Sequence, residues 1–397
     1  MLKRFETLYT GHVDLDNIGY GGTPVMQRHY PNEVLAGAHD KAEQVAKAVD
    51  RLGYYSFWTA EHHFQPEGYE CLPNLLMLYV HLAHVTENVK LGCGFNITPM
   101  WHPLRLAEDF AVADILTGGR VIMGVGRGYH TREVETFGSP LLDQDANRDL
   151  FEEQVEILLK ALREDRFSHH GKYYDLPPSP PVDYRGDPLE ELSLVPRPTH
   201  PVECWQPIQG ATERGLDFMV RHGLKGMTGG GVAASGIMLP VVEAWQAAHA
   251  RAGRETQLGE DLSVGFHFYI ADSQEEAIRR LTPYFQENIK MFGPLRLLRS
   301  LSDEQIENLK STDTALADTT LPRLEDSVAN GSVLCGTAEQ IIERLHALEE
   351  EVPGLESITL GHPSGVTADE IIEQYQRFAE DVMPAFAGRT EAVGVGV

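Results

Sequence analysis

Apolar runs of strand length alternate with segments of helical periodicity along this chain, and this alternation limits the folds that it can adopt. About eight such runs can be counted. They cover residues 4–9, 54–59, 89–95, 120–125, 202–207, 225–228, 262–270 and 357–360. Alternating strands and helices favour a parallel sheet covered by helices, and eight strands match a (β/α)8 barrel. We therefore predict an α/β fold, a TIM barrel with insertions at the C-terminal face of its strands.

The segments between these runs carry helix signals. In residues 34–52, apolar side chains recur at three- and four-residue spacings, and Gly53 follows as a stop. Similar patterns cover residues 104–116, 145–162, 235–252, 337–348 and 368–386.

Three stretches do not fit the repeat, so we expect one barrel domain over residues 1–397 with excursions at about 11–32, 166–199 and 290–331. The second is rich in proline and should be irregular. The third shows two short helical patterns joined by residues 311–314. An insertion on the active face of a barrel is about as often a plain surface excursion as a lid.

The charge of the chain narrows its possible partners. It carries 59 acidic against 33 basic side chains, a formal net charge of −26. This charge repels polyphosphates and anionic lipid surfaces, so we expect neither nucleic acid nor a membrane as a partner. The four cysteines have no metal-ligand spacing, and the first ten residues lack the apolar core of a signal peptide. We therefore expect a cytoplasmic protein with free thiols.

Titratable side chains follow the second predicted strand, where Glu61, His62 and His63 precede Phe64. Because ligands of β/α barrels bind beyond the carboxyl ends of the strands, we interpret this tetrad as part of a site. If the strand continues through it, His62 and His63 point in opposite directions and cannot both ligate one metal. Two histidines that merely fix the strand end are an alternative. A bound metal is not expected, because neither an HxH nor an HExxH spacing occurs.

A second cluster ends the fourth predicted strand, where Arg127 follows Gly124 and Gly126. A guanidinium at a strand end offers a planar fork suited to phosphate, although a salt bridge to Glu133 is an alternative. The glycines do not form a dinucleotide-binding fingerprint, because Tyr129 stands where its third glycine should be.

Two further clusters follow the fifth and the third predicted strands. Residues 209–215 lead into a helix, and Thr212 either belongs to a phosphate cradle or simply caps that helix. Gly92 and Gly94 either let a flat ring approach the backbone or mark a bulge.

Taken in this order, the clusters resemble the bacterial luciferase-like, flavin-dependent monooxygenase family. The tetrad at 61–64 is similar to the family's second-strand motif, and residues 101–109 are similar to its following helix entry. Residues 119–138 resemble its fourth-strand segment, and residues 336–339 and 381–384 also match. The resemblance covers nearly the whole chain, and the ordered combination is specific although each piece is modest.

The resemblance implies a barrel that binds reduced FMN at its C-terminal face. His62 matches the catalytic histidine, with Glu61 and His63 as supports. Family members often carry a non-prolyl cis peptide at the position of Gly94–Phe95. The implied cofactor-binding residues are Gly94, Phe95, Arg127, Tyr129, Ala211, Thr212 and Gly215. Light-emitting members carry a reactive cysteine where this chain has Gly126, so the resemblance does not extend to light emission.

The implied activity is that of a two-component monooxygenase. Reduced FMN, delivered by a separate NAD(P)H:flavin reductase, reacts with O2 through a C4a-hydroperoxide and oxygenates a small organic substrate, while residues 290–331 close as a lid. The alternatives are F420-dependent hydride transfer on the same barrel, a metal-dependent hydrolase, and a non-catalytic flavin-binding subunit, which would have no need of His62. The family also implies a homodimer through early barrel helices, where Leu75, Leu76, Tyr79 and Leu82 either form the contact patch or face the barrel.

Overall fold

Eight parallel strands close into a barrel in the computed structural model, which describes residues 1–178, 182–229, 238–295, 301–310 and 321–388. The barrel strands are β1 (Arg4–Tyr9), β2 (Ser56–Thr59), β3 (Lys90–Cys93), β5 (Val121–Gly126), β8 (Cys204–Pro207), β9 (Lys225–Gly229), β10 (Leu262–Ile270) and β12 (Ser357–Gly361). Strand β1 pairs with β2 and β12, and the pairing of β9 with β10 completes the ring. The predicted barrel and its eight strands are confirmed.

Four further strands of the described residues lie outside this ring. Strand β4 (Asn96–Ile97) pairs with β5, so the strand predicted at 89–95 is broken where the Gly94–Phe95 peptide bond is cis. Strand β11 (Val333–Gly336) pairs with the last four residues of β10, beyond those that pair with β9. Strands β6 (His169–His170) and β7 (Asp175–Leu176) form a separate antiparallel pair.

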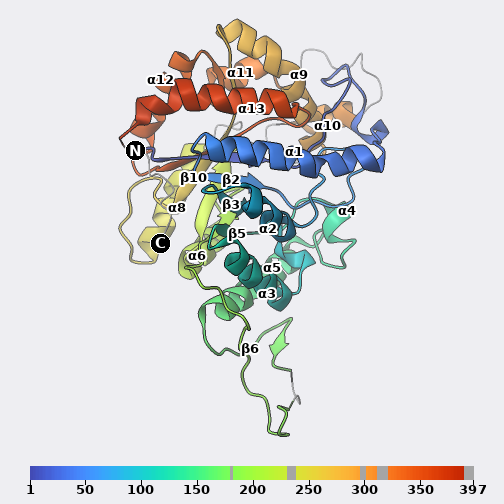
Figure 1. Ribbon diagram of the computed structural model, residues 1–397, viewed down its shortest axis with the longest axis vertical. Helices are drawn as coiled ribbons and strands as arrows, with labels where there is room; N and C mark the ends of the chain where they lie inside the picture. Colours follow the sequence, from blue (N-terminus) through green and yellow to red (C-terminus); the bar gives the residue numbers. More distant parts are fainter. Residues whose placement is uncertain (179–181, 230–237, 296–300, 311–320, 389–397) are drawn as a thin grey trace.

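Helices surround the barrel (Figure 1). They are α1 (Asn32–Arg51), α2 (Leu75–Val85), α3 (Pro103–Thr117), α4 (Thr131–Val134), α5 (Gln144–Arg163), α6 (Glu213–His222), α8 (Met238–Arg251), α9 (Gln274–Phe292), α10 (Asp303–Lys310), α11 (Leu324–Ala329), α12 (Ala338–Glu351) and α13 (Ala368–Arg377). The helix predicted at 235–252 begins outside the described residues. The one predicted at 368–386 is α-helical only to Arg377, after which a π turn and a 3-10 turn follow. In the described part of the chain, no helix combines the length and apolar composition that crossing a membrane requires.

The apolar pattern did not predict helix α2, because its sequence is apolar on most faces and lacks a clear helical period. Only the family resemblance placed residues of this segment on an early barrel helix. Asn74 caps its first turn by accepting a hydrogen bond from the backbone N–H of Met77 at 2.9 Å. Four of its large side chains are at most 3% exposed, whereas Met77 is 74% exposed. These are the four that could instead have formed a dimer patch: Leu75, Leu76, Tyr79 and Leu82.

The excursions differ in how they join the barrel. Segment 11–32 follows β1, whereas 166–199 follows α5, is irregular apart from β6 and β7, and projects away from the barrel (Figure 1). The two short helices predicted in 290–331 are α10 and α11. The linker at 311–314 and the prolines at 180–181 lie outside the described residues.

A polar floor fills the lower half of the barrel. The buried Glu6 carboxylate accepts hydrogen bonds from Trp58 Nε1 at 3.0 Å, Ser357 Oγ at 2.7 Å and Thr359 Oγ1 at 3.1 Å. Burial raises the pKa of Glu6 although these hydrogen bonds oppose the rise. Trp58 also packs against Trp205 and Ile122 in the barrel interior. These side chains fill the part of the barrel interior around Glu6 and Trp58.

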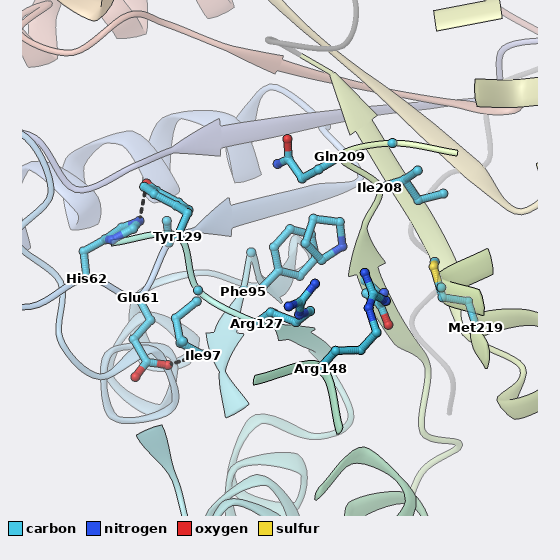
Figure 2. Close-up of a pocket in the computed structure, with 18 of the residues that line it drawn as sticks. Glu61, His62, Phe95, Ile97, Arg127, Tyr129, Arg148, Ile208, Gln209 and Met219 are labelled. Carbon is cyan, nitrogen blue, oxygen red and sulfur yellow. Dashed lines mark hydrogen bonds between the residues drawn. The ribbon is translucent and has the colours of Figure 1, made fainter. Parts of the chain in front are cut away.

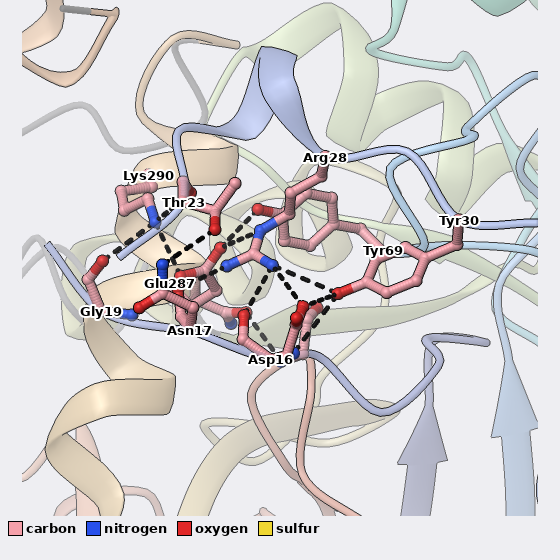
Figure 3. Close-up of polar contacts among 11 residues, drawn as sticks. Asp16, Asn17, Gly19, Thr23, Arg28, Tyr30, Tyr69, Glu287 and Lys290 are labelled. Atoms are coloured by element: carbon pink, nitrogen blue, oxygen red, sulfur yellow. Dashed lines mark hydrogen bonds and ion pairs between the residues drawn. The ribbon is translucent and has the colours of Figure 1, made fainter. Parts of the chain in front are cut away.

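A buried charge cluster holds segment 11–32 against the end of α9 (Figure 3). The Glu287 carboxylate accepts from Arg28 Nε at 3.0 Å, Lys290 Nζ at 2.8 Å, Tyr69 OH at 2.5 Å and the Gly19 backbone N–H at 2.8 Å. The side chains of Arg28, Glu287 and Lys290 are at most 6% exposed. Both cations also donate to backbone carbonyls of the excursion, so the cluster joins two distant parts of the chain.

We predict that Glu287→Gln lowers the free energy of unfolding by about 3–5 kcal/mol, because it leaves two buried cations without a buried anion. Urea denaturation at neutral pH measures this change. The matched control is Glu108→Gln, which removes the exposed ion pair with Arg105 and should cost less than about 1 kcal/mol. Equal losses in the two variants would contradict the structural role of the cluster.

Candidate active site

A cavity of about 430 Å³ lies at the carboxyl ends of the barrel strands (Figure 2). Its wall includes Thr10 after β1, Ala60 after β2, Gly126 at the end of β5 and Pro207 at the end of β8. Seven of the eight predicted site residues also line it: His62, Gly94, Phe95, Arg127, Tyr129, Thr212 and Gly215. Ala211 is exposed and lies outside this lining.

The imidazole of His62 is buried between two carboxylates at one end of the cavity. Its Nδ1 lies 3.1 Å from both carboxylate oxygens of Glu133, and its Nε2 lies 2.9 Å from the Tyr129 hydroxyl and 3.2 Å from Glu70 Oε1. Burial disfavours the charged imidazole, but Glu70 and Glu133 outweigh it and raise the pKa of His62 to about 9. The two carboxylates therefore favour the protonated imidazole, in which both nitrogens can donate.

The rest of the tetrad supports the neighbouring loop. Strand β2 ends at Thr59, so the tetrad lies in the loop that follows it. Glu61 accepts from the backbone N–H of Ile97 at 2.9 Å, from Trp101 Nε1 at 2.9 Å and from His63 Nε2 at 3.0 Å. These bonds fix the segment after β3. His63 bonds Glu61 and packs edge-on against Phe137 at 4.9 Å, whereas His62 bonds Glu133. Because the strand ends before the tetrad, strand alternation does not account for this difference.

The glycines of the wall allow close backbone approach. A Cβ on Gly124 would lie 1.8 Å from the carbonyl oxygen of Cys93, and one on Gly126 would lie 3.2 Å from Phe95 Cβ. Both glycines therefore let β5 pack against β3 and the cis Gly94–Phe95 segment. Of these two glycines, Gly126 lines the cavity together with Gly94, and the absence of side chains there leaves room for a flat ring. The break between β3 and β4 also agrees with the bulge interpretation.

Arginine side chains make the opposite end of the cavity cationic. Arg127 donates from Nε to Asn147 Oδ1 at 2.8 Å and from a terminal nitrogen to the Gln144 carbonyl oxygen at 2.8 Å. The alternative salt bridge to Glu133 is wrong, because Glu133 bonds His62 instead. Burial, with the nearby Arg148, lowers the pKa of Arg127 to about 10, and Arg127 forms no ion pair with any carboxylate of the described residues.

Thr212 and Gly215 complete this end. Thr212 occupies the N-cap position of α6, but its side chain makes no capping hydrogen bond, so the hydroxyl is available to a ligand. A Cβ on Gly215 would lie 3.0 Å from Thr212 Oγ1 and 3.1 Å from a terminal nitrogen of Arg148. The missing side chain thus leaves an open cradle between a hydroxyl, a guanidinium and a helix N-terminus, which suits phosphate.

These residues fit a phosphorylated ring cofactor. The cavity volume lies in the range of about 300–1,000 Å³ that ligand pockets occupy. Arg127, Arg148 and Thr212 would hold the phosphate, and Gly94 with Phe95 would support the ring. Among the described residues, no group of three or more His, Cys, Asp and Glu side chains is arranged to hold a metal ion.

Sequence reasoning missed Arg148, Glu70 and Phe292, all of which line the cavity. Arg148 lies in the second turn of α5, near the N-terminus, where the helix dipole does not stabilise a cation. A cation at such a position is a weak signal that it serves a function other than helix stability. Both Glu70 and Phe292 contact Tyr129 only because the fold brings distant segments together. No local sequence pattern therefore marks either residue.

Comparison with known proteins identifies relatives of the whole chain. The family model described as "Luciferase-like monooxygenase" matches residues 22–353. The oxygenase component of a flavin-dependent trigonelline monooxygenase from Acinetobacter baylyi is 24% identical, with 91% of this chain and 94% of that protein covered. Two uncharacterised proteins of Sinorhizobium fredii are 33% and 38% identical, but the matched segments span only 42% of each.

Solved structures share the fold. The oxygenating constituent of 3,6-diketocamphane monooxygenase from Pseudomonas putida, a type II Baeyer–Villiger monooxygenase in complex with FMN, matches with a TM-score of 0.71. The two chains are 19% identical, with 97% of this chain and 99% of the other covered. An F420-dependent secondary alcohol dehydrogenase matches with a TM-score of 0.65, 16% identity and coverage of 97% and 99%. At these identities the likeness concerns the fold alone.

Proposed function

Because the chain belongs to the luciferase-like monooxygenase family, we propose that it is an FMN-dependent monooxygenase that uses reduced FMN and O2 to oxygenate a small organic substrate. The observation that carries this proposal is a single cavity with a cationic end at Arg127 and a charged imidazole at the other end (Figure 2). The phosphate of FMN suits the first end. The reactive edge of its ring suits the second.

The cofactor-binding residues divide by position in the cavity. Arg127 and Arg148 provide cations for the phosphate, and the turn at Ala211, Thr212 and Gly215 provides a hydroxyl and the N-terminus of α6. We assign Ala211 only a backbone role, because its side chain does not line the cavity. Gly94, Phe95 and Tyr129 would contact the ring. When bound, reduced FMN supplies the electrons for activating O2.

His62 is the proposed catalytic residue. Its two flanking carboxylates favour the protonated form, so it acts as a hydrogen-bond donor at Nε2 and not as a general base. A positioned donor of this kind contributes about a hundredfold or more to rate. Tyr129 shares this hydrogen-bonded group and lines the cavity beside Phe292, and both aromatic rings help to exclude water.

The supply of reduced flavin is part of the proposal. Two similar proteins are named as an oxygenase component and an oxygenating constituent, which favours a separate NAD(P)H:flavin reductase for this chain as well. We also propose that the protein is a homodimer, that residues 1–397 form one domain and that the protein is cytoplasmic. Closure of 290–331 as a lid stays a prediction, since much of that segment lies outside the described residues.

F420-dependent hydride transfer remains the second candidate, because one matching structure is an F420-dependent alcohol dehydrogenase and the phosphate cradle suits either cofactor. Anaerobic titration with reduced FMN and with reduced F420, followed by mixing with O2, separates the two. We predict tight binding of reduced FMN and oxygen consumption that yields an oxygenated product with a suitable substrate. Binding of F420 without oxygen consumption would favour hydride transfer, and binding of neither cofactor would reject both proposals.

We predict that Arg127→Met weakens FMN binding roughly ten- to hundredfold, because each charge-assisted hydrogen bond to phosphate contributes about 1.5–3 kcal/mol. Fluorescence titration with FMN measures the change, and riboflavin, which lacks the phosphate, should lose little affinity. The control is Arg105→Met on the exposed face of α3, which should leave both affinities unchanged. An equal loss of riboflavin affinity would show that Arg127 does not act through the phosphate, and would contradict its proposed role.

We predict that His62→Asn keeps FMN affinity within a few fold of normal, since the phosphate lies at the far end of the cavity. Product formation should fall by about a hundredfold or more, because the donor at Nε2 is lost. The adjacent His63→Asn variant is the control, since His63 points away from the cavity. Full coupled activity in His62→Asn would reject the catalytic role.

A further inference from the structure

The two carboxylates that flank His62 occupy different places in the site. Glu133 comes from α4 and lies behind the imidazole, outside the cavity lining. Glu70 comes from the loop between β2 and α2, is 2% exposed and lines the cavity on the Nε2 side of the ring. Of the two carboxylates, only Glu70 therefore lines the cavity beside His62.

The hydrogen bonds among His62, Tyr129, Glu70 and Glu133 determine which atom carries each proton. The Tyr129 hydroxyl donates its proton to Glu70 Oε1 at 2.8 Å, so the Tyr129 hydroxyl oxygen is left to accept from His62 Nε2 at 2.9 Å. On the other side of the ring, Nδ1 donates to Glu133. Without the Glu70 carboxylate, the Tyr129 hydroxyl would be free to donate to Nε2, which requires an unprotonated nitrogen. The direction of one hydrogen bond thus decides whether His62 carries its second proton.

The backbone around Glu70 is anchored on both sides. The preceding residue, Tyr69, donates to the buried Glu287 at 2.5 Å (Figure 3). The backbone N–H of the following residue, Cys71, donates to the Gly11 carbonyl oxygen at 3.0 Å. Gln65 Nε2 fixes the second carboxylate oxygen of Glu70 at 2.9 Å. The carboxylate is therefore held in place before any ligand binds.

Other charged groups near His62 do not replace Glu70. Glu61 is occupied by Ile97, Trp101 and His63, and Glu67 forms two 2.8 Å bonds with Arg132. Burial lowers the pKa of the nearby His130, which favours its neutral form.

We propose that Glu70 is a positioning residue: its carboxylate accepts the Tyr129 hydroxyl proton, so the Tyr129 oxygen can accept from Nε2 and His62 keeps its second proton. The consequence for catalysis rests on the proposed function, in which the charged imidazole and its Tyr129 partner lie beside the reactive edge of the ring. The geometry itself concerns only the chain's own residues and is present without a ligand.

The inference sets the direction of the pH dependence. The pKa of His62 is raised to about 9, so the proton on Nε2 is present below that pH and is lost as the pH rises through it. Burial raises the pKa of Glu70, although His62 opposes the rise. Removal of the Glu70 charge should therefore move the deprotonation of His62, and the alkaline fall in activity, to lower pH.

The test is a titration of His62 by 15N NMR in the flavin-free protein, with the signal assigned by its absence in His62→Asn. In Glu70→Gln we expect the His62 pKa to fall by about one unit or more, a tenfold loss of proton affinity. Glu67→Gln is the matched control, because it removes a buried carboxylate from the same loop and should leave the titration unchanged. An unchanged His62 pKa in Glu70→Gln, or equal shifts in both variants, would overturn the inference.

A second readout uses the reaction. In Glu70→Gln, kcat at alkaline pH should fall about tenfold or more with FMN affinity retained, and Glu70→Asp should recover part of the high-pH activity. An alkaline limb that does not move would overturn the inference even if the variant were less stable. If the wild-type protein binds no flavin, the proposed function fails, whereas the NMR titration still tests the role of Glu70.

Discussion

The separation of charge across one cavity is the constraint on which the rest of the site depends. Arginine side chains collect at one end, and an imidazolium between two buried carboxylates occupies the other. Buried charges are tolerated only when partners satisfy them, so the carboxylates and the imidazole stabilise one another. The guanidinium of Arg127 bonds only neutral groups among the described residues, which leaves its charge available to an anionic ligand.

The barrel was predictable because its signals are local. Each barrel strand is a short apolar run, and amphipathic helices such as α1 follow many of them, so period and order were sufficient for the fold. The resemblance to a family then gave His62, Arg127 and Thr212, which line the same cavity. The apolar pattern did not reveal helix α2, because its apolar residues have no helical period. It did not reveal β11 either, because this run of four residues was not distinct from its surroundings.

The parts of the site that were not predicted arise from contacts between distant segments. Glu70 meets Tyr129 across 59 positions of sequence, and Tyr69 meets Glu287 across 218. No spacing rule in the sequence relates such pairs. The role of each pair in the site also depends on which group accepts the proton of the tyrosine hydroxyl. The same limit applies to Glu133, which the sequence offered only as an alternative partner of Arg127 and which the fold pairs with His62.

The floor of the barrel has a consequence for the order in which ligands arrive. Glu6 and the packed indoles of Trp58 and Trp205 seal the interior from below, so everything that enters must pass the rim formed by the strand ends. A ring lying flat on the glycine wall would occupy the deepest position. A substrate would then rest above it and block its exit, so loading would be sequential, with the cofactor first in and last out.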